Sequence, residues 1–95
     1  FYGASTLLII LARSAGPHPN EDCCLAAQST LLAAHALGLG TCWIGFATPL
    51  LNQPKVKEEL AIPTDYSVVA PLIVGYPQGK LPPIPRNQPE VLFWK

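Results

Sequence analysis

The sequence contains no methionine and no excess of charge of either sign. Six basic and six acidic side chains balance one another, and charged residues make up 13% of the 95 positions. A neutral chain gives no electrostatic reason to expect a nucleic acid or an anionic membrane surface as a partner. The chain begins at Phe1 without an initiator methionine, which is consistent with a fragment or a processed product of a longer polypeptide.

Cysteine is scarce, and its pattern excludes two kinds of cross-link. The three cysteines are an odd number, and Cys23 and Cys24 are adjacent whereas Cys42 lies apart. This pattern fits neither a disulfide framework nor the Cys-x-x-Cys spacing of a zinc site. The apolar start of the chain lacks the basic leader of a signal peptide. We therefore expect reduced, buried thiols and a cytoplasmic protein.

Charge is missing altogether from a long stretch in the middle of the chain. No Asp, Glu, Lys or Arg occurs between Asp22 and Lys55, although a surface helix of a soluble domain shows a charged face. The pattern predicts a helix capped at Asn20 or Asp22 and stopped by Gly38, about sixteen residues long, which is too short to cross a bilayer. We therefore expect no membrane partner. The apolar residues fall on two stripes, which indicates two neighbours: Leu25, Leu32, Ala36 and Leu39 on one, and Cys23, Ala27, Leu31 and Ala34 on the other.

Three other apolar runs predict strands. The sequence favours strands over Ser5–Ala12, Thr41–Phe46 and Ser67–Tyr76, with an amphipathic helical piece over Pro49–Leu60. The first and third runs show no alternation, which is typical of strands covered on both faces. Pro71 cannot donate to a ladder and marks an edge, a bulge or a strand start. The proline-rich residues 77–95 predict an extended C-terminal arm.

Together these elements indicate an α+β fold, with an α/β-like mixed sheet flanked by helices, in which residues 1–95 form a single partial domain. Strands buried on both faces need helices above and below them. The chain supplies one long apolar helix and one short one. The missing cover could be a second copy of the chain, a different subunit, or a part of the protein outside these residues.

Three segments of the chain resemble the C-terminal half of a known family. They are FYGASTLLII at residues 1–10, DCCLAAQSTLLAAHALGLGTCWIGF at residues 22–46 and VAPLIVGYP at residues 69–77. The most specific part is the Ala-Ala-Gln helix followed by Gly-Leu-Gly-x-x-Trp-Ile-Gly. On these residues the chain resembles the nitroreductase family of flavoproteins, and the resemblance spans nearly the whole chain.

The resemblance carries expectations about fold and activity. It implies an obligate homodimer of mixed α+β fold that binds FMN at the interface between its subunits. It also implies hydride transfer from NAD(P)H through the flavin to nitroaromatics, quinones or enones, while some family members carry out dehydrogenation or iodide removal.

The same resemblance indicates the site residues. The loop Trp43, Ile44 and Gly45 resembles the segment whose backbone amides face the flavin ring near N5, where a glycine allows close approach. The alternative is that Gly45 is only a tight turn after a strand. Arg86 falls where the family places a basic residue on the FMN phosphate, for which a guanidinium is well suited. Ile84 replaces a second basic residue there, and a solvated Arg86 is the alternative.

The family's N-terminal half is absent from these residues, together with its arginine-rich phosphate and ribityl motif. We therefore expect the isolated chain to be inactive and unable to hold FMN. Two functions remain open from the sequence. The first is an FMN-dependent NAD(P)H oxidoreductase in which this chain is one half of the fold, completed by a missing N-terminal half. The second is a non-catalytic scaffold or dimerisation remnant that binds no flavin.

Overall fold

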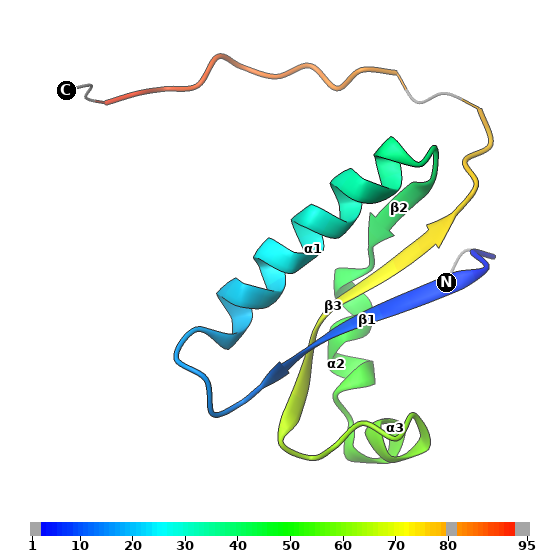
Figure 1. Cartoon of the computed structure of the whole chain (residues 1–95), viewed down its shortest axis with the longest axis vertical. Helices are drawn as coiled ribbons and strands as arrows, with labels where there is room; N and C mark the ends of the chain where they lie inside the picture. The colour runs from blue at the N-terminus through cyan, green and yellow to red at the C-terminus, as the bar shows by residue number, and fades with distance from the viewer. Residues whose placement is uncertain (1–2, 80–81, 93–95) are drawn as a thin grey trace.

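The computed structural model describes residues 3–79 and 82–92. Its strands form one three-stranded sheet in the order β1-β3-β2, and both pairings are antiparallel (Figure 1). The predicted α+β class is confirmed, although the expected mixed sheet is purely antiparallel in the part described. The elements in chain order are β1 (Thr6–Arg13), α1 (Pro19–Ala36), β2 (Gly40–Trp43), the 3-10 turn η1 (Gly45–Ala47), α2 (Thr48–Leu51), α3 (Pro54–Glu59) and β3 (Tyr66–Gly75).

The last strand in the chain, β3, is the central strand of the sheet. Pro71 lies opposite Ile9 of β1 in the middle of β3, so the prediction that it marks a sheet edge or a strand start is wrong. The register shifts nearby, where Leu11 pairs with Val68 and Ile10 pairs with Ala70. Val69 of β3 is therefore extra, and it makes a β-bulge two residues before the proline, close to the bulge that was the third predicted alternative.

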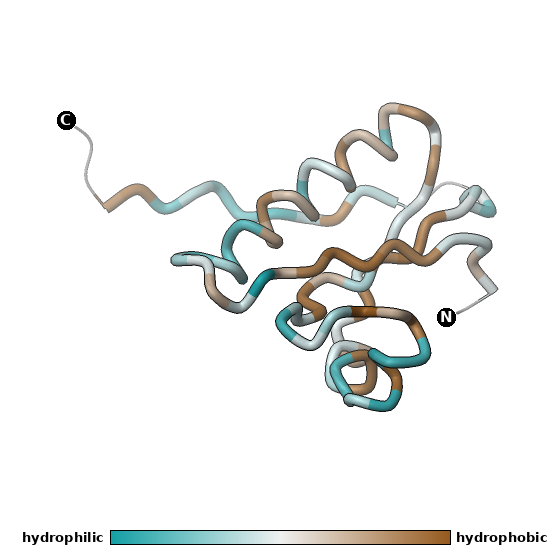
Figure 2. The backbone as a smooth tube through the Cα atoms, turned by 60° about the horizontal axis from the view of Figure 1, so that its bottom comes forward, coloured by the Kyte–Doolittle hydropathy of each residue, from teal (hydrophilic) through white to brown (hydrophobic). Residues whose placement is uncertain are grey.

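Helices cover both faces of the sheet, as the apolar strands predict. On one face, Ala27 of α1 packs with Ala70 and Leu72 of β3. On the other face the core contains one residue each from η1, α2 and β3 and two residues from the connecting loops. They are Ala47, Leu51 and Val68, with Ile44 and Ile62. Figure 2 shows the strands between α1 and the α2–α3 segment. The cover is incomplete, because the β1 residue Leu8 is 40% exposed.

The long helix starts earlier than predicted and stops where predicted. Its N-cap is His18, which makes no side-chain capping bond, and Pro19 opens the helix, because a proline at the first helical position loses no hydrogen bond there. Asn20 and Asp22 thus lie inside the first turns. At the other end Gly38 has φ of +78°, and its amide and that of Leu39 donate to helix carbonyls at 3.0 and 2.9 Å, which is a Schellman stop.

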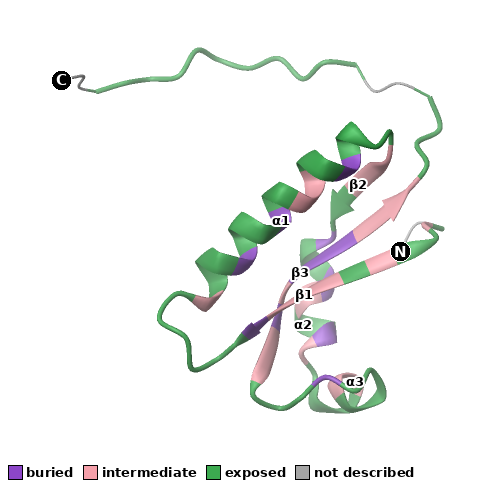
Figure 3. Ribbon diagram, in the orientation of Figure 1, coloured by how far each residue is buried: buried purple, intermediate pink, exposed green. Residues whose placement is uncertain are grey.

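Among the described residues, only one of the two stripes of α1 has a neighbour. Cys23, Ala27 and Ala34 are buried against the sheet, whereas Leu25 and Leu32 are 69% and 61% exposed. Figure 3 shows this difference between the sheet side of α1 and its outer side. Within residues 3–79 and 82–92 no helix has the length and apolarity needed to cross a membrane.

Three further predictions need correction. β2 stops at Trp43 rather than Phe46. The predicted helix over Pro49–Leu60 is divided into α2 and α3 at Gln53, which is extended with ψ of 136° because the residue before a proline disfavours the helical region. All three cysteines are free, but only Cys23 is buried; adjacent positions on a helix face different directions.

Candidate functional site

The predicted loop at Trp43, Ile44 and Gly45 is the junction between β2 and η1. The Ile44 side chain is 3% exposed and packs in the core beneath α2, while Trp43 is 37% exposed and Gly45 is exposed. Burying an isoleucine contributes about 1.5–3 kcal/mol. Ile44 therefore anchors the loop, and the residues on either side of it face outward.

Pro71 explains why β2 ends at this loop. The Ile44 amide donates to the Pro71 carbonyl at 2.9 Å, but proline has no N–H with which to return the second bond of the pair. The Ile44 carbonyl instead accepts from the Ala47 amide at 3.1 Å. That bond closes the η1 turn at the position where Pro71 cannot supply the second hydrogen bond of a strand pair.

The backbone at Gly45 has open space in front of it. A Cβ added to Gly45 meets no heavy atom within 4 Å, and Gly45 is not among the glycines with positive φ. Packing within the chain therefore does not require glycine at this position. Among the described residues, no backbone carbonyl accepts from the Gly45 amide. A flat group could approach this backbone closely and accept a hydrogen bond from it.

The other two amides of the loop differ. The Ile44 amide is already bonded to Pro71. Hydrogen-bonded and non-bonded pairs alternate in an antiparallel ladder. The Trp43 amide, one residue before Ile44, therefore points away from β3, toward the other edge of β2. The loop thus offers backbone donors at Trp43 and Gly45 and none at Ile44.

Arg86 lies on the arm that follows β3. Residues 82–92 have no regular secondary structure and are exposed, and Figure 1 shows the arm continuing away from the sheet. Among the described residues, no hydrogen bond or ion pair joins Arg86 to another side chain. The structure therefore does not bring Arg86 together with the loop at Gly45.

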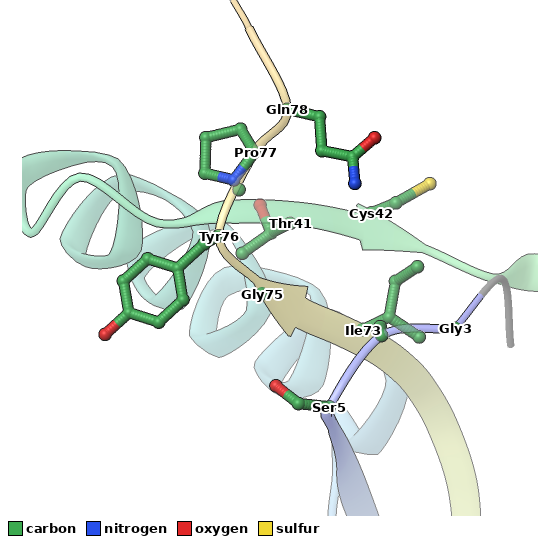
Figure 4. Close-up of a pocket in the computed structure, with 11 residues that line it drawn as sticks. Gly3, Ser5, Thr41, Cys42, Ile73, Gly75, Tyr76, Pro77 and Gln78 are labelled. Atoms are coloured by element: carbon green, nitrogen blue, oxygen red, sulfur yellow. The ribbon is translucent and has the colours of Figure 1, made fainter.

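An open hollow that sequence reasoning missed lies at the end of β3, lined by residues that precede β1 and by residues of β2 (Figure 4). Its volume is about 440 Å³. Its polar side chains include Ser5, Thr41 and Gln78, and none of the described residues that line it is a carboxylate, lysine, arginine or histidine. Gly40 and Gly75, which pair across β2 and β3, also line the hollow. Glycines at neighbouring strand ends were the available sequence signal.

Metal chemistry finds no support in the described part of the chain. Residues 3–79 and 82–92 contain no group of three histidine, cysteine, aspartate or glutamate side chains that could hold an ion. Among the same residues, the pKa that clearly departs from its ordinary value is that of Cys23, which burial raises, with smaller contributions from Cys24 and Asp22. Cys23 packs away from the Gly45 loop, on the α1 face of the sheet.

Comparison with known proteins identifies relatives for most of the chain. The sequence is 40% identical over 69 residues to an FMN reductase (NADPH) of Bacillus subtilis, covering 70% of this chain and 27% of that protein. A nitroreductase with bound FMN from Bacteroides fragilis matches 92% of this chain with a TM-score of 0.77 and 27% identity, and 49% of that structure is covered. An FMN-dependent nitroreductase of Clostridium difficile matches 95% with a TM-score of 0.79 and 28% identity, covering 58% of that structure.

The matches cover most of this chain but only part of each relative. The chain spans about a third of the length of the curated relatives it matches and about half of the length of the similar structures. The model of the nitroreductase family matches residues 1–76, from the first strand to the end of β3. The chain therefore belongs to the nitroreductase family.

Proposed function

We propose that this chain forms one half of an FMN-dependent NAD(P)H oxidoreductase that reduces nitroaromatic, quinone or enone acceptors. The observation that carries the proposal is the loop at Gly45, where a buried Ile44 anchors an exposed backbone with a free amide and open space before it. The cofactor class comes from one similar structure with bound FMN and from another that is named FMN-dependent.

The residues of the loop fit a flavin ring. FMN, when bound, accepts hydride at its ring and delivers it to a second substrate. The Gly45 amide would donate to the ring near N5, and the absence of a side chain would permit the approach. The buried Ile44 side chain and the hydrogen bond from the Ile44 amide to the Pro71 carbonyl fix the position of this backbone. Arg86 would provide the charge-assisted contact to the phosphate.

The proposal includes residues outside this chain. The outer stripe of α1 is exposed, and β1 is only partly covered, so the assembled protein would bury these surfaces against a second copy or against an N-terminal half of the fold. The match to about half of each similar structure agrees with that arrangement. A cytoplasmic location remains a prediction from the cysteine pattern.

One observation favours a second function. Arg86 lies on an exposed arm apart from Gly45, as expected for a scaffold that keeps the fold and dimerises without flavin. The two functions differ in flavin content, because the scaffold would be colourless.

The test compares two preparations. The complete polypeptide, purified with its upstream residues, should retain FMN with its visible absorbance and should oxidise NAD(P)H when a quinone or nitroaromatic is added. The chain of residues 1–95, mixed with FMN, should bind it weakly or not at all. A complete polypeptide that takes up no FMN supports the scaffold, and tight stoichiometric binding by residues 1–95 contradicts the need for a second half.

A further inference from the structure

The side-chain amide of Asn52 makes the hydrogen bonds to β3 that a neighbouring strand would otherwise make. After the Ile44–Pro71 bond, none of the described strands pairs with β3 on that side. The Val68 amide donates to Oδ1 of Asn52 at 2.8 Å, and Nδ2 of Asn52 donates to the Val68 carbonyl at 2.9 Å. One side chain thus supplies the donor and the acceptor that a paired backbone residue would supply.

Asn52 also holds the end of α2. Its Nδ2 and its backbone amide both donate to the carbonyl of Thr48, each at 3.1 Å. Thr48 begins α2, and α2 follows η1 without a break. Asn52 therefore ties the helical segment that starts at Gly45 to the central strand of the sheet.

The segment from Ile44 to Asn52 is fixed to β3 at both ends. Ile44 bonds to Pro71, and Asn52 bonds to Val68, three residues away on the same strand. Between these points Ala47 and Leu51 are buried at 5% and 4% exposure. A segment held at two points on one strand, with a packed side between them, keeps its backbone in a narrow range of positions.

We propose that Asn52 is a positioning residue that sets the Gly45 backbone in the flavin site, and this rests on the function proposed above. Asn52 acts through α2 and η1. A side-chain amide is required because a carboxylate would place acceptors against the Val68 and Thr48 carbonyls and would have no donor to offer them. The half-buried position of Asn52 makes such unpaired groups costly.

The experiment uses the complete polypeptide carrying Asn52→Asp. Asn20→Asp, at an exposed position in the first turn of α1, is the matched control for the chemical change. Leu31→Ala, which removes packing on the opposite face of the sheet, controls for lost stability. The measurements are the flavin absorption spectrum and midpoint potential, the rate constant of flavin reduction by NAD(P)H, and hydrogen exchange at the Ala47 amide.

We expect Asn52→Asp to shift the spectrum and potential and to lower the reduction rate constant about tenfold or more, since small misplacements of a reacting group have effects of that order. The Ala47 amide should exchange faster. Asn52→Gln, which keeps the amide on a longer arm, should recover part of the rate. Both controls should keep the spectrum, the potential and the rate of the unsubstituted protein, although Leu31→Ala melts at a lower temperature.

Two results would overturn the positioning role. One is a folded, FMN-bound Asn52→Asp variant with unchanged spectrum, rate and Ala47 exchange. The other is loss of folding in both Asn52 variants while Leu31→Ala stays folded, which would assign Asn52 to the fold as a whole. If the proposed function is wrong, the unsubstituted polypeptide binds no FMN. Faster exchange of the Ala47 amide in Asn52→Asp would then still show the effect of Asn52 on the loop.

Discussion

The amide of Ile44 donates to the carbonyl of Pro71 at 2.9 Å, and Pro71 cannot return a hydrogen bond. This one-sided pair ends β2 and leaves the Ile44 carbonyl to the Ala47 amide. The geometry of the candidate flavin loop therefore depends on the residue type at a position on another strand.

Pro71→Ala tests this dependence. The new N–H competes for the Ile44 carbonyl, so we expect the β2–β3 pairing to lengthen and the Ala47 amide to exchange up to about tenfold faster, because a hydrogen bond contributes about 0.5–1.5 kcal/mol. Hydrogen exchange followed by NMR in the complete polypeptide measures this. Pro63→Ala, in an exposed turn before β3, is the control. Unchanged exchange at Ala47 would show that the turn forms for another reason.

Gly45→Val separates folding from flavin chemistry. An added Cβ meets no heavy atom of the described residues within 4 Å, so we expect the stability to change by no more than about 0.5 kcal/mol. In the complete polypeptide the same side chain would occupy the space proposed for the flavin ring, and the rate of flavin reduction should fall about 100-fold or flavin should be lost. Stopped-flow spectroscopy and thermal melts measure the two effects. Gly16→Val, in the exposed turn after β1, should have neither effect; equal rates for both variants would leave the loop as a structural turn.

Arg86→Ala reports on the phosphate contact. If Arg86 binds the FMN phosphate in the complete polypeptide, the variant should lose about 1.5–3 kcal/mol of FMN binding free energy. Arg13→Ala provides the comparison, because the Arg13 guanidinium already donates to the Tyr66 hydroxyl at 3.2 Å and pairs with Asp65 at 3.9 Å. Fluorescence titration with FMN gives both affinities. An unchanged affinity for Arg86→Ala assigns that guanidinium to solvent.

The exposed stripe of α1 predicts self-association of the 95-residue chain. A chain that melts cooperatively should be a dimer or larger, because Leu25 and Leu32 would otherwise leave an apolar patch in water. Leu32→Glu should shift the species toward monomer in light scattering. Leu60→Glu, at a 48% exposed position after α3, should leave the assembly unchanged. A monomeric unsubstituted chain with a cooperative melt, at low concentration, would contradict the prediction.

The three cysteines should differ in reactivity. Cys24 and Cys42 are exposed, whereas Cys23 is buried and its pKa is raised by desolvation, with Cys24 and Asp22 adding to the shift. The thiolate is the nucleophile, so a raised pKa lowers its fraction at any given pH and moves the half-maximal alkylation rate of Cys23 to higher pH. Brief iodoacetamide labelling followed by mass spectrometry measures each site. Equal labelling of all three in the folded chain, as in urea, would show that Cys23 is open to solvent.

Features that depend on a few adjacent residues were predicted correctly from the sequence. Features that depend on contacts between distant segments were not. Gly38 stops α1 as expected, because a left-handed C-terminal residue is a property of the glycine itself. The position of Pro71 could not be read in the same way, since it depends on which strands pair across the sheet. The role of Asn52 was likewise hidden, because its partner Val68 is sixteen residues away. The loop at residues 43–45 was found by resemblance, but the free and occupied amides within it became visible only from the pairing of β2 with β3.

The central place of β3 also decides when this sheet can form. β1 and β2 both pair with β3, and β3 is the last of the three strands to be synthesised. Until about residue 75 has left the ribosome, the two outer strands have no partner strand among the described elements. During that time α1 is the element that can cover their apolar residues. Sheets closed by such distant pairings fold slowly, and their unpaired edges are open to aggregation in the meantime. A ribosome that pauses before Tyr66 would therefore hold α1, α2 and α3 together with two strands whose partner strand has not yet been made.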